Sequence, residues 1–174
     1  MHRYFNIALI VLLCLSILGF FWNTISVLRF PYVIDYGEAP LIDQANRVLA
    51  NQAIYQADFS TPPYVVANYP PIYPILVAGL SHLSGMSPLL SGRIISLASA
   101  IASAGILASL SKALVGNRLS WLAAMGIFLG HPYVLSWSPL ARVDLLALFF
   151  CLAALVIVYH HWLSWRWLTL ALVL

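Results

Sequence analysis

Charged residues are scarce in this chain of 174 residues, of which they make up only 7%. A soluble domain carries roughly 25%, so this composition excludes an ordinary soluble protein. Hydrophobic residues account for 63% of the chain. The eight Lys and Arg are scattered singly. Because there is no basic run, we expect no nucleic-acid partner.

Cysteine is also rare. Cys14 and Cys151 each lie inside an apolar stretch, which favours neither a disulfide nor a CxxC metal site. The five His are dispersed except for His160-His161, and this pair is more typical of a membrane interface than of a metal site.

Long apolar stretches predict an all-α fold, a polytopic bundle of transmembrane helices. We expect four spans and the start of a fifth, at about 7–28, 89–114, 119–137, 140–162 and 166–174. The first apolar core, about 22 residues long, exceeds the roughly 7–15 of a signal peptide and is read as a retained helix. The last is shorter than the roughly 20 residues a bilayer requires. We therefore expect the chain to be the N-terminal part of a longer protein.

Residues at the ends of these spans indicate where the helices begin and which side of the membrane each loop occupies. Ser138 is the expected N-cap of the fourth span, and Pro139 its first residue. Basic residues divide four against four between the two sides, so they do not set the orientation. All five acids share a side with four of the arginines. This favours a functional outer face, with the N-terminus in the cytoplasm.

The long loop at about 30–88 is expected to lie outside and to carry interfacial helices. Apolar residues at helical spacing predict an amphipathic helix at about 40–54 that lies on the membrane surface. Asp43 and Arg47 are four apart and should pair. A Pro-rich link then leads into an apolar run ending near Leu83, which is too short to span and is expected to be interfacial or re-entrant.

The acidic residues are the first candidates for chemistry. Four lie in this loop: Asp35, Glu38, Asp43 and Asp58. Asp35 and Glu38 follow the first span closely, where a carboxylate serves as a general base; the alternative is a pair of ordinary loop acids. The fifth acid, Asp144, is either functional or a helix-start acid.

Two arginines are candidates for binding phosphate. Arg93 begins the second span and Arg142 the fourth, and a guanidinium suits bidentate phosphate contacts. The alternative is that each extends to the interface as a snorkelling side chain. Arg142 and Asp144 are two apart and would not face one another on a helix, so each is expected to need another partner.

Small residues indicate close helix packing. The Gly126-x-x-x-Gly130 pattern is expected to pack within the bundle rather than to dimerise. Ser96, Ser99 and Ser103 share one helical face and also indicate a close helix contact.

The order of these features resembles the N-terminal part of GT-C membrane glycosyltransferases. The likeness is to the protein mannosyltransferase/aminoarabinose transferase group (family 39) and its RgtA/B/C/D-like relatives. It covers nearly the whole chain, and order and spacing carry it rather than any single motif. The matching stretches are Asp35-Tyr36-Gly37-Glu38-Ala39-Pro40, Ala45 to Tyr55, Asn68-Tyr69-Pro70-Pro71-Ile72-Tyr73-Pro74, Gly92-Arg93 and Ala141-Arg142-Val143-Asp144.

This resemblance implies transfer of a sugar from a polyprenyl-phosphate donor to an acceptor hydroxyl on a lipid, glycan or protein. It places the enzyme, a hexosyl- or pentosyltransferase, in a bacterial inner or plasma membrane, at the extracytoplasmic face. The family's catalytic acid usually stands in an Asp-Glu pair. Asp35 matches the Asp, but Tyr36 replaces the Glu, so either Asp35 or Glu38 is the expected base.

The remaining site residues follow from the same resemblance. Arg93 and Arg142 would bind the donor phosphate, and Tyr73, in the Pro-rich link at the rim through which the lipid enters, would also bind the substrate. Asp144 would position the site or a divalent metal, Mg²⁺ or Mn²⁺. Two alternatives stay open, a non-catalytic partner subunit that keeps the fold, and a transporter or flippase component for lipid-linked sugars. An ion-coupled transporter would place acids in mid-span, and here none lies there.

Overall fold

The computed structural model describes residues 2–56, 58–60, 62, 64, 66, 69–161 and 164–174, which contain helices and no strand. Asn68 of the Pro-rich link and Trp162 at the end of the fourth expected span lie outside these described residues. The prediction of an all-α fold is confirmed for the described part of the chain. The helices are α1 (His2–Leu28), α2 (Glu38–Leu49), α3 (Ile72–Ser84), α4 (Pro88–Val115), α5 (Arg118–Gly130), α6 (Pro132–Trp137), α7 (Asp144–His161) and α8 (Trp165–Val173).

Three of these helices, α1, α4 and α7, are long and apolar enough to cross a membrane. The first and second expected spans agree with α1 and α4 to within a few residues. Ser87 caps α4 by accepting a hydrogen bond from the Leu90 N–H, and Pro88 follows as its first residue. At its other end, α4 stops at Gly116, which adopts the left-handed conformation that glycine tolerates.

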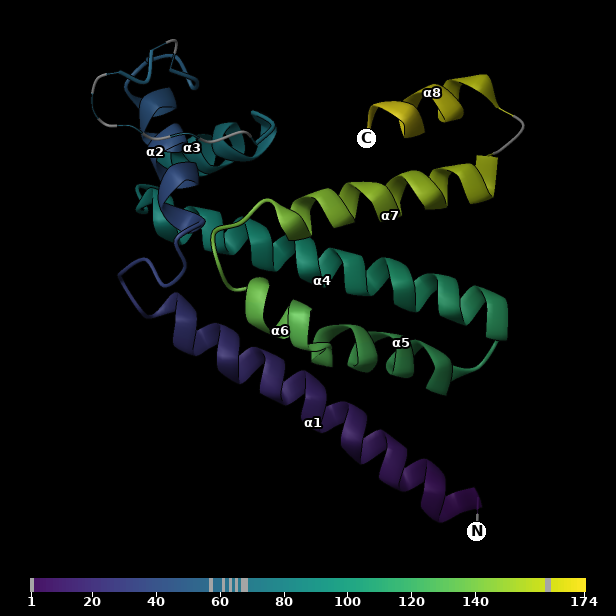
Figure 1. The fold of residues 1–174 in the computed structure, drawn as a ribbon. Coiled ribbons are helices and arrows are strands. Elements are labelled where there is room, and N and C mark those ends of the chain that lie inside the picture. Colours follow the sequence, from purple (N-terminus) through teal and green to yellow (C-terminus); the bar gives the residue numbers. More distant parts are fainter. Residues whose placement is uncertain are drawn as a thin grey trace.

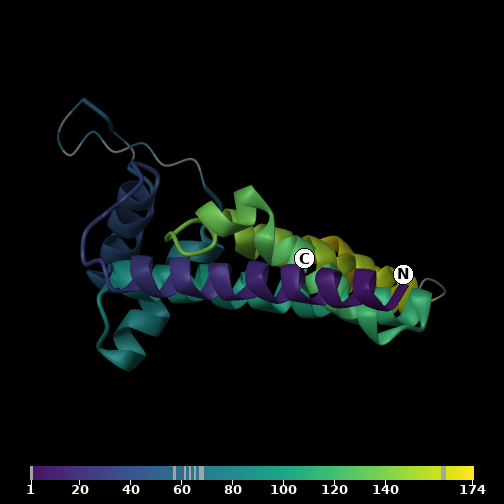
Figure 2. The same cartoon turned by 90° about the horizontal axis from the view of Figure 1, so that it is seen from below.

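The long helices lie side by side, with α4 in the middle. It packs against α5 on one side and α7 on the other, and α1 covers α5 (Figure 1). Phe20 of α1, Ala100 and Ala104 of α4 and Leu145 of α7 contribute to the buried core between them. The short helices α2 and α3 gather at one end, and α2 stands across the long helices (Figure 2). The N-terminus lies at the other end.

Glycines bring α1 and α5 into close contact. A Cβ added at Gly126 would lie 2.7 Å from Cδ2 of Leu13, and one at Gly130 would lie 2.8 Å from Cβ of Ser16. The GxxxG pattern therefore packs within the bundle, as predicted. The serine face of α4 is also a packed one, since Ser96, Ser99 and Ser103 are all buried.

The expected third span at 119–137 is wrong as a single helix. The chain forms α5 and α6, separated at His131, whose backbone is extended (φ −63°, ψ 130°). Pro132 explains the break, because a proline removes a helical N–H and disfavours the α conformation at the residue before it. Pro132 then occupies the start of α6, where a proline is tolerated.

The expected start of the fourth span is also wrong. Ser138 ends α6 instead of capping the next helix, and α7 begins only at Asp144. Between them the backbone turns, and the N–H groups of Ala141 and Arg142 bond to side chains of other segments. This irregular stretch places Arg142 outside the helix, where it is free to face Asp144.

The helical part of the long loop differs from expectation in extent and in what it contacts. The predicted helix at 40–54 is α2, which ends at Leu49, and Asn51 follows with a positive φ of 55°. Its buried residues Leu41 and Ala45 pack with Tyr73 and Val77 of α3. The apolar face of α2 is therefore covered by protein, which corrects the expectation that it lies on lipid.

Other local predictions for this loop are confirmed. Arg47 Nε donates to Asp43 Oδ2 at 2.8 Å, as the spacing of four residues predicted. The apolar run after the Pro-rich link is α3, whose 13 residues are fewer than the roughly 20 that a span requires. It ends at Gly85 in the left-handed conformation.

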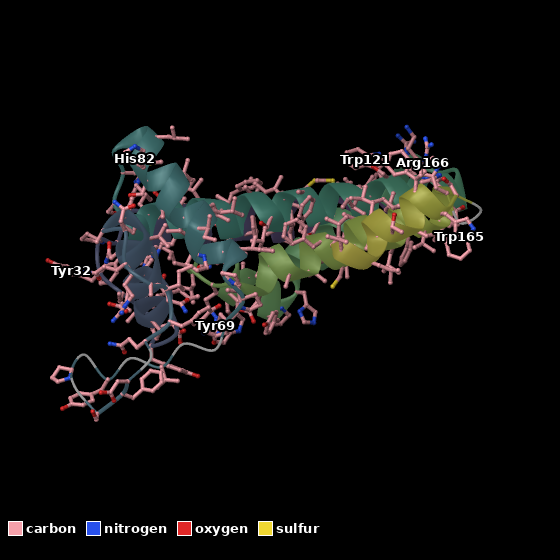
Figure 3. The ribbon with its side chains drawn as sticks, turned by 90° about the horizontal axis from the view of Figure 1, so that it is seen from above. Tyr32, Tyr69, His82, Trp121, Trp165 and Arg166 are labelled. Atoms are coloured by element: carbon pink, nitrogen blue, oxygen red, sulfur yellow. The ribbon has the colours of Figure 1, made fainter. Side chains whose placement is uncertain are left out.

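Polar and aromatic side chains gather at both ends of the long helices (Figure 3). Tyr32, Tyr69 and His82 lie at the end formed by α2 and α3, whereas Trp121, Trp165 and Arg166 lie at the opposite end. Tyrosine, tryptophan and arginine are enriched where transmembrane helices meet the bilayer surface. This distribution is the one expected if the long helices cross a bilayer.

Candidate active site

Two clusters of arginines and carboxylates lie where α1 ends, α2 begins and the stretch between α6 and α7 turns. The first pairs Glu38 with Arg93, and the second joins Arg142 to Asp35 and Asp144. Three of the five acidic residues of the chain enter these clusters, and a fourth, Asp43, pairs with Arg47 on α2 instead. The two clusters differ sharply in exposure.

The Glu38–Arg93 pair is buried. The side chain of Arg93 is 1% exposed and that of Glu38 is not exposed at all. Arg93 Nε donates to Glu38 Oε1 at 2.9 Å, and Nη2 donates to Oε2 at 3.0 Å. Its remaining N–H groups donate to backbone carbonyls just after and within the last turn of α1, those of Val27, Phe30 and Tyr32. All five N–H groups of the guanidinium are thus engaged.

Glu38 is equally committed. Oε1 accepts a second hydrogen bond from the Ala141 N–H at 2.8 Å, and Oε2 accepts one from the Ile34 N–H at 2.8 Å. Burial alone would raise the pKa of Glu38, but the hydrogen bonds from Arg93, Ala141 and Ile34 and the charge of Arg93 outweigh it and hold the pKa below its ordinary value. The carboxylate stays ionised, and it ties α1, α2, α4 and the turn before α7 together.

The second cluster is half-buried and centred on Arg142. Its Nη1 donates to Asp35 Oδ2 at 2.6 Å, and its Nε donates to Asp144 Oδ2 at 2.9 Å. The side chain of Asp35 is 17% exposed and that of Asp144 is 28% exposed. The expectation that Arg142 and Asp144 need separate partners is wrong, because Arg142 is not helical.

Several polar groups in this second cluster have no partner within the described residues. Asp35 Oδ2 also accepts from the Gly37 N–H at 2.9 Å, but no hydrogen bond from the described part of the chain reaches Asp35 Oδ1. Only two of the five N–H groups of Arg142 have an acceptor there. A carboxylate oxygen and guanidinium donors therefore remain available side by side.

Aromatic side chains of α6 hold this cluster from one side. The ring of Trp137 lies under the Arg142 guanidinium, with its centroid 4.1 Å from Cζ. Tyr133 donates its hydroxyl to Asp144 Oδ1 at 3.0 Å. Burial and this hydrogen bond raise the pKa of Tyr133 above its ordinary value, so the hydroxyl remains a donor.

Gly37 allows the close approach between the loop and Arg142. A Cβ on this residue would collide with Arg142 Nη1 and would lie 2.8 Å from Asp35 Oδ2. No larger residue fits between the Asp35 loop and the guanidinium without displacing one of them. The two acids that flank Gly37 in sequence consequently belong to different clusters.

Tyr73 is buried beside the backbone of residue 142 and lines the edge of an apolar cavity. It is 2% exposed, and its hydroxyl donates to the Gly92 carbonyl at 2.9 Å and lies 3.0 Å from Ser96 Oγ. Ser96 Oγ in turn donates to the Arg142 carbonyl at 2.8 Å. Burial raises the pKa of Tyr73 above its ordinary value, so it is a permanent donor in this network.

An apolar cavity of about 220 Å³ lies beside Val143, the residue that follows Arg142. Tyr73 and Ile72 of α3 line it on one side, and Val143, Leu146 and Phe150 line it on the other. Hydrocarbon-lined space therefore begins one residue along the chain from Arg142. A ligand with an anionic head and an apolar tail matches this pairing.

Two carboxylates, those of Asp35 and Asp144, would be the protein ligands of the expected divalent metal. Mg²⁺ is commonly bound through one or two carboxylates, with waters and substrate phosphates completing its octahedral set. Here Asp35 and Asp144 are both bonded to the Arg142 guanidinium, which occupies the space between them. No group of three or more His, Cys, Asp or Glu gathers anywhere in the described part of the chain.

The structure thus brings together all six residues singled out from the sequence, but in two separate groups. Asp35, Arg142 and Asp144 form the accessible cluster, whereas Glu38, Arg93 and Tyr73 are buried among protein groups. The sequence reading missed Tyr133 and Ser96 as parts of the site. Trp137 was not singled out either, although Pro132 is a sequence signal that the helix breaks before it.

The chain matches no protein-family model, no curated protein and no solved structure.

Proposed function

We propose that this chain forms the donor end of an inverting membrane glycosyltransferase that uses a polyprenyl-phosphate sugar. The enzyme is placed in the plasma membrane as a multi-pass protein, with α2, α3 and the site on the extracytoplasmic side. One observation carries the proposal: Asp35 keeps an unpaired carboxylate oxygen beside unpaired Arg142 donors within the described residues. An apolar hollow begins at Val143, the next residue after Arg142, and the helices long enough to span include α7, which starts at Asp144.

Arg142 is the proposed contact for the donor phosphate. A guanidinium with free N–H groups binds phosphate oxygens in a bidentate manner. The apolar cavity lined by Val143 and Leu146 accommodates the first part of the polyprenyl chain. Arg93 is not assigned this role, because all of its donors already serve Glu38 and the end of α1.

Asp35 is the proposed general base, and Glu38 is not. Glu38 has both oxygens bonded and no exposed surface, whereas Asp35 is 17% exposed and its Oδ1 has no partner within the described residues. In the reaction, the acceptor oxygen forms a bond to the anomeric carbon, and the bond from that carbon to the phosphate oxygen breaks. Asp35 takes the hydroxyl proton, and the electron pair leaves with the polyprenyl phosphate.

Asp144 and Trp137 are proposed to keep Arg142 in place during this step. Asp144 anchors Nε and the Trp137 ring supports the guanidinium plane. The N–H groups on Nη2, which have no acceptor within the described residues, are the ones proposed to contact the phosphate. Charge that develops on the departing phosphate would be stabilised by this fixed cation.

The test is a transfer assay in membranes from a strain lacking the gene, complemented with wild-type or variant protein. Undecaprenyl phosphate carrying radiolabelled glucose, mannose or aminoarabinose serves as the donor probe, and label is followed into lipid, glycan and protein fractions. Asp35→Asn should lower transfer at least a hundredfold, the lower end of what a general base contributes. The matched control is Asp58→Asn, because Asp58 bonds only to Ser60 within the described residues.

Two results would overturn the proposal. Wild-type sugar transfer by Asp35→Asn would show that Asp35 is not the general base. Binding of the donor without any transfer by the wild-type protein would favour a non-catalytic partner subunit that keeps the lipid-phosphate site.

A further inference from the structure

We infer that Tyr73 and Ser96 are positioning residues that set the Arg142 guanidinium by holding the backbone of residue 142. This inference rests on the proposed function for its meaning in donor binding, although the geometry it concerns is independent of any reaction. It adds a role to the expected contact of Tyr73 with the lipid substrate: Tyr73 lines the apolar cavity, but its hydroxyl faces protein groups.

One side chain, that of Ser96, forms hydrogen bonds with both the N–H and the carbonyl of Arg142. Ser96 Oγ donates to the Arg142 carbonyl at 2.8 Å and accepts from the Arg142 N–H at 3.2 Å. Ser96 has no exposed surface. Both bonds lie in a segment that belongs to no helix. The Arg142 N–H also donates to the Leu140 carbonyl at 2.9 Å, so within the described residues it is the Arg142 carbonyl that depends on Ser96 alone.

Tyr73 fixes Ser96 in turn. Its hydroxyl lies 3.0 Å from Ser96 Oγ and 2.9 Å from the Gly92 carbonyl oxygen. The single tyrosine proton serves one of these two acceptors at a time. When Tyr73 donates it to Ser96 Oγ, the proton of Ser96 is left for the Arg142 carbonyl. Neutral hydrogen bonds in a buried network such as this strengthen one another.

The approach of α4 to the Arg142 segment is as close as side chains allow. A Cβ added at Gly92 would lie 2.8 Å from Cβ of Ala141 and 3.1 Å from the Tyr73 hydroxyl oxygen. The next N–H along the chain before Arg142 belongs to Ala141 and is bonded to Glu38. Residues 141 and 142 are therefore held at consecutive positions by two different buried side chains, Glu38 and Ser96.

A fixed backbone at residue 142 has a direct effect on the side chain. The direction of the Cα–Cβ bond follows from the backbone, and the guanidinium must reach Asp35 and Asp144 on two sides at once. Displacement by a fraction of an ångström would lengthen one of these bonds and would move Cζ relative to the Trp137 ring, now 4.1 Å away. Trp137 consequently reports on the position of Arg142.

The experiment uses the protein in nanodiscs with 5-fluorotryptophan at its six tryptophans. The Trp137 fluorine resonance is assigned with Trp137→Phe, and Arg142→Gln gives its position when the guanidinium is absent. Tyr73→Phe and Ser96→Ala should each shift the Trp137 resonance. The matched controls Tyr55→Phe and Ser99→Ala should not, because these hydroxyls bond to the carbonyls of Tyr69 and Ile95.

A second measurement links this position to binding of undecaprenyl phosphate, titrated into the same nanodiscs. Tyr73→Phe should weaken binding about two- to tenfold, as expected for the loss of one net hydrogen bond. In the Arg142→Gln background the same change should have no further effect on affinity. A general loss of stability would instead weaken binding by the same factor in both backgrounds.

The outcomes separate this inference from the proposed function. A Trp137 resonance that is unchanged in Tyr73→Phe, which removes a single oxygen atom, overturns the positioning role. This variant decides the matter even if Ser96→Ala does not fold. If the resonance shifts but the wild-type protein does not bind undecaprenyl phosphate, the positioning role of Tyr73 stands and the lipid-phosphate function fails.

Discussion

Arg93 donates hydrogen bonds to both carboxylate oxygens of Glu38, from Nε to Oε1 at 2.9 Å and from Nη2 to Oε2 at 3.0 Å. Neither side chain has more than 1% of its surface exposed. The pair joins α4 to α2 across 55 residues of sequence. Through the same two side chains the end of α1 and the turn before α7 are bonded as well. We interpret it as the structural lock that holds the accessible Arg142 cluster in shape.

Removing one partner of this lock should be costly. Glu38→Gln or Arg93→Met leaves a buried charge without its counterion, which costs about 3–5 kcal/mol. The double variant should lose less than the sum of the two, because no lone charge remains. Unfolding in detergent, followed by circular dichroism, measures the difference. If each single variant lost little stability and the double variant lost the sum of the two, the pair would not be the structural lock proposed here.

The exposed ion pair on α2 provides the matched control. Asp43 and Arg47 are four residues apart and partly exposed, and such pairs contribute well under 1 kcal/mol. Asp43→Asn should therefore leave the unfolding transition nearly unchanged. A large loss of stability in Asp43→Asn would mean that any change of charge on α2 destabilises the protein, and the effect at Glu38 would not be specific to its burial.

Stability should depend on pH through Glu38. Its folded pKa lies below its ordinary value, so the unfolded chain binds a proton more readily than the folded protein. The stabilisation is fully present above the unfolded pKa of about 4.3 and is lost as the pH falls through the folded pKa. Melting temperatures between about pH 3 and 7 should therefore fall on the acid side.

Glu38→Gln tests whether this carboxylate is the source of that slope. Without a titrating group at position 38, the variant should start from a lower melting temperature and lose less of it on acidification. If wild type and variant fall in parallel, other acids account for the acid sensitivity.

Gly37→Ala should damage the Arg142 cluster without unfolding the helices. The added methyl group collides with the guanidinium and lies 2.8 Å from Asp35 Oδ2, so Arg142 must move. We expect binding of undecaprenyl phosphate to weaken about tenfold or more, measured in nanodiscs. Gly79→Ala on α3 is the control, since a Cβ there meets nothing within 4 Å. Equal affinities for the two variants would contradict the proposed position of the phosphate.

The parts of the fold that depend on local composition could be predicted from the sequence. The helices α1 and α4 follow from long apolar runs, and the Asp43–Arg47 pair follows from helical spacing. The start of α7 could not be found in this way. Ala141 and Arg142 bond to Glu38 and Ser96, which are distant in sequence, and these bonds draw the segment out of the helix.

The candidate site shows the same division. Asp35, Glu38, Arg93 and Arg142 attract attention because charge is rare in this chain, but their pairing depends on the tertiary structure. Glu38 and Asp35 are three residues apart, yet Glu38 is buried in an ion pair with Arg93 of α4, whereas Asp35 is partly exposed and pairs with Arg142. No spacing rule separates two acids in one loop, and only the close contact at Gly37 directs them to different arginines.

The most direct measurement of the central claim is chemical rescue of an Asp35 variant. Asp35→Ala removes the proposed base and leaves space for a small carboxylate, so transfer from undecaprenyl-phosphate sugar should be lost and then restored by added formate. The same formate should not restore Arg142→Gln, which lacks the phosphate contact. Rescue confined to Asp35→Ala is the result that the account predicts. Wild-type transfer by Asp35→Ala without formate would contradict it.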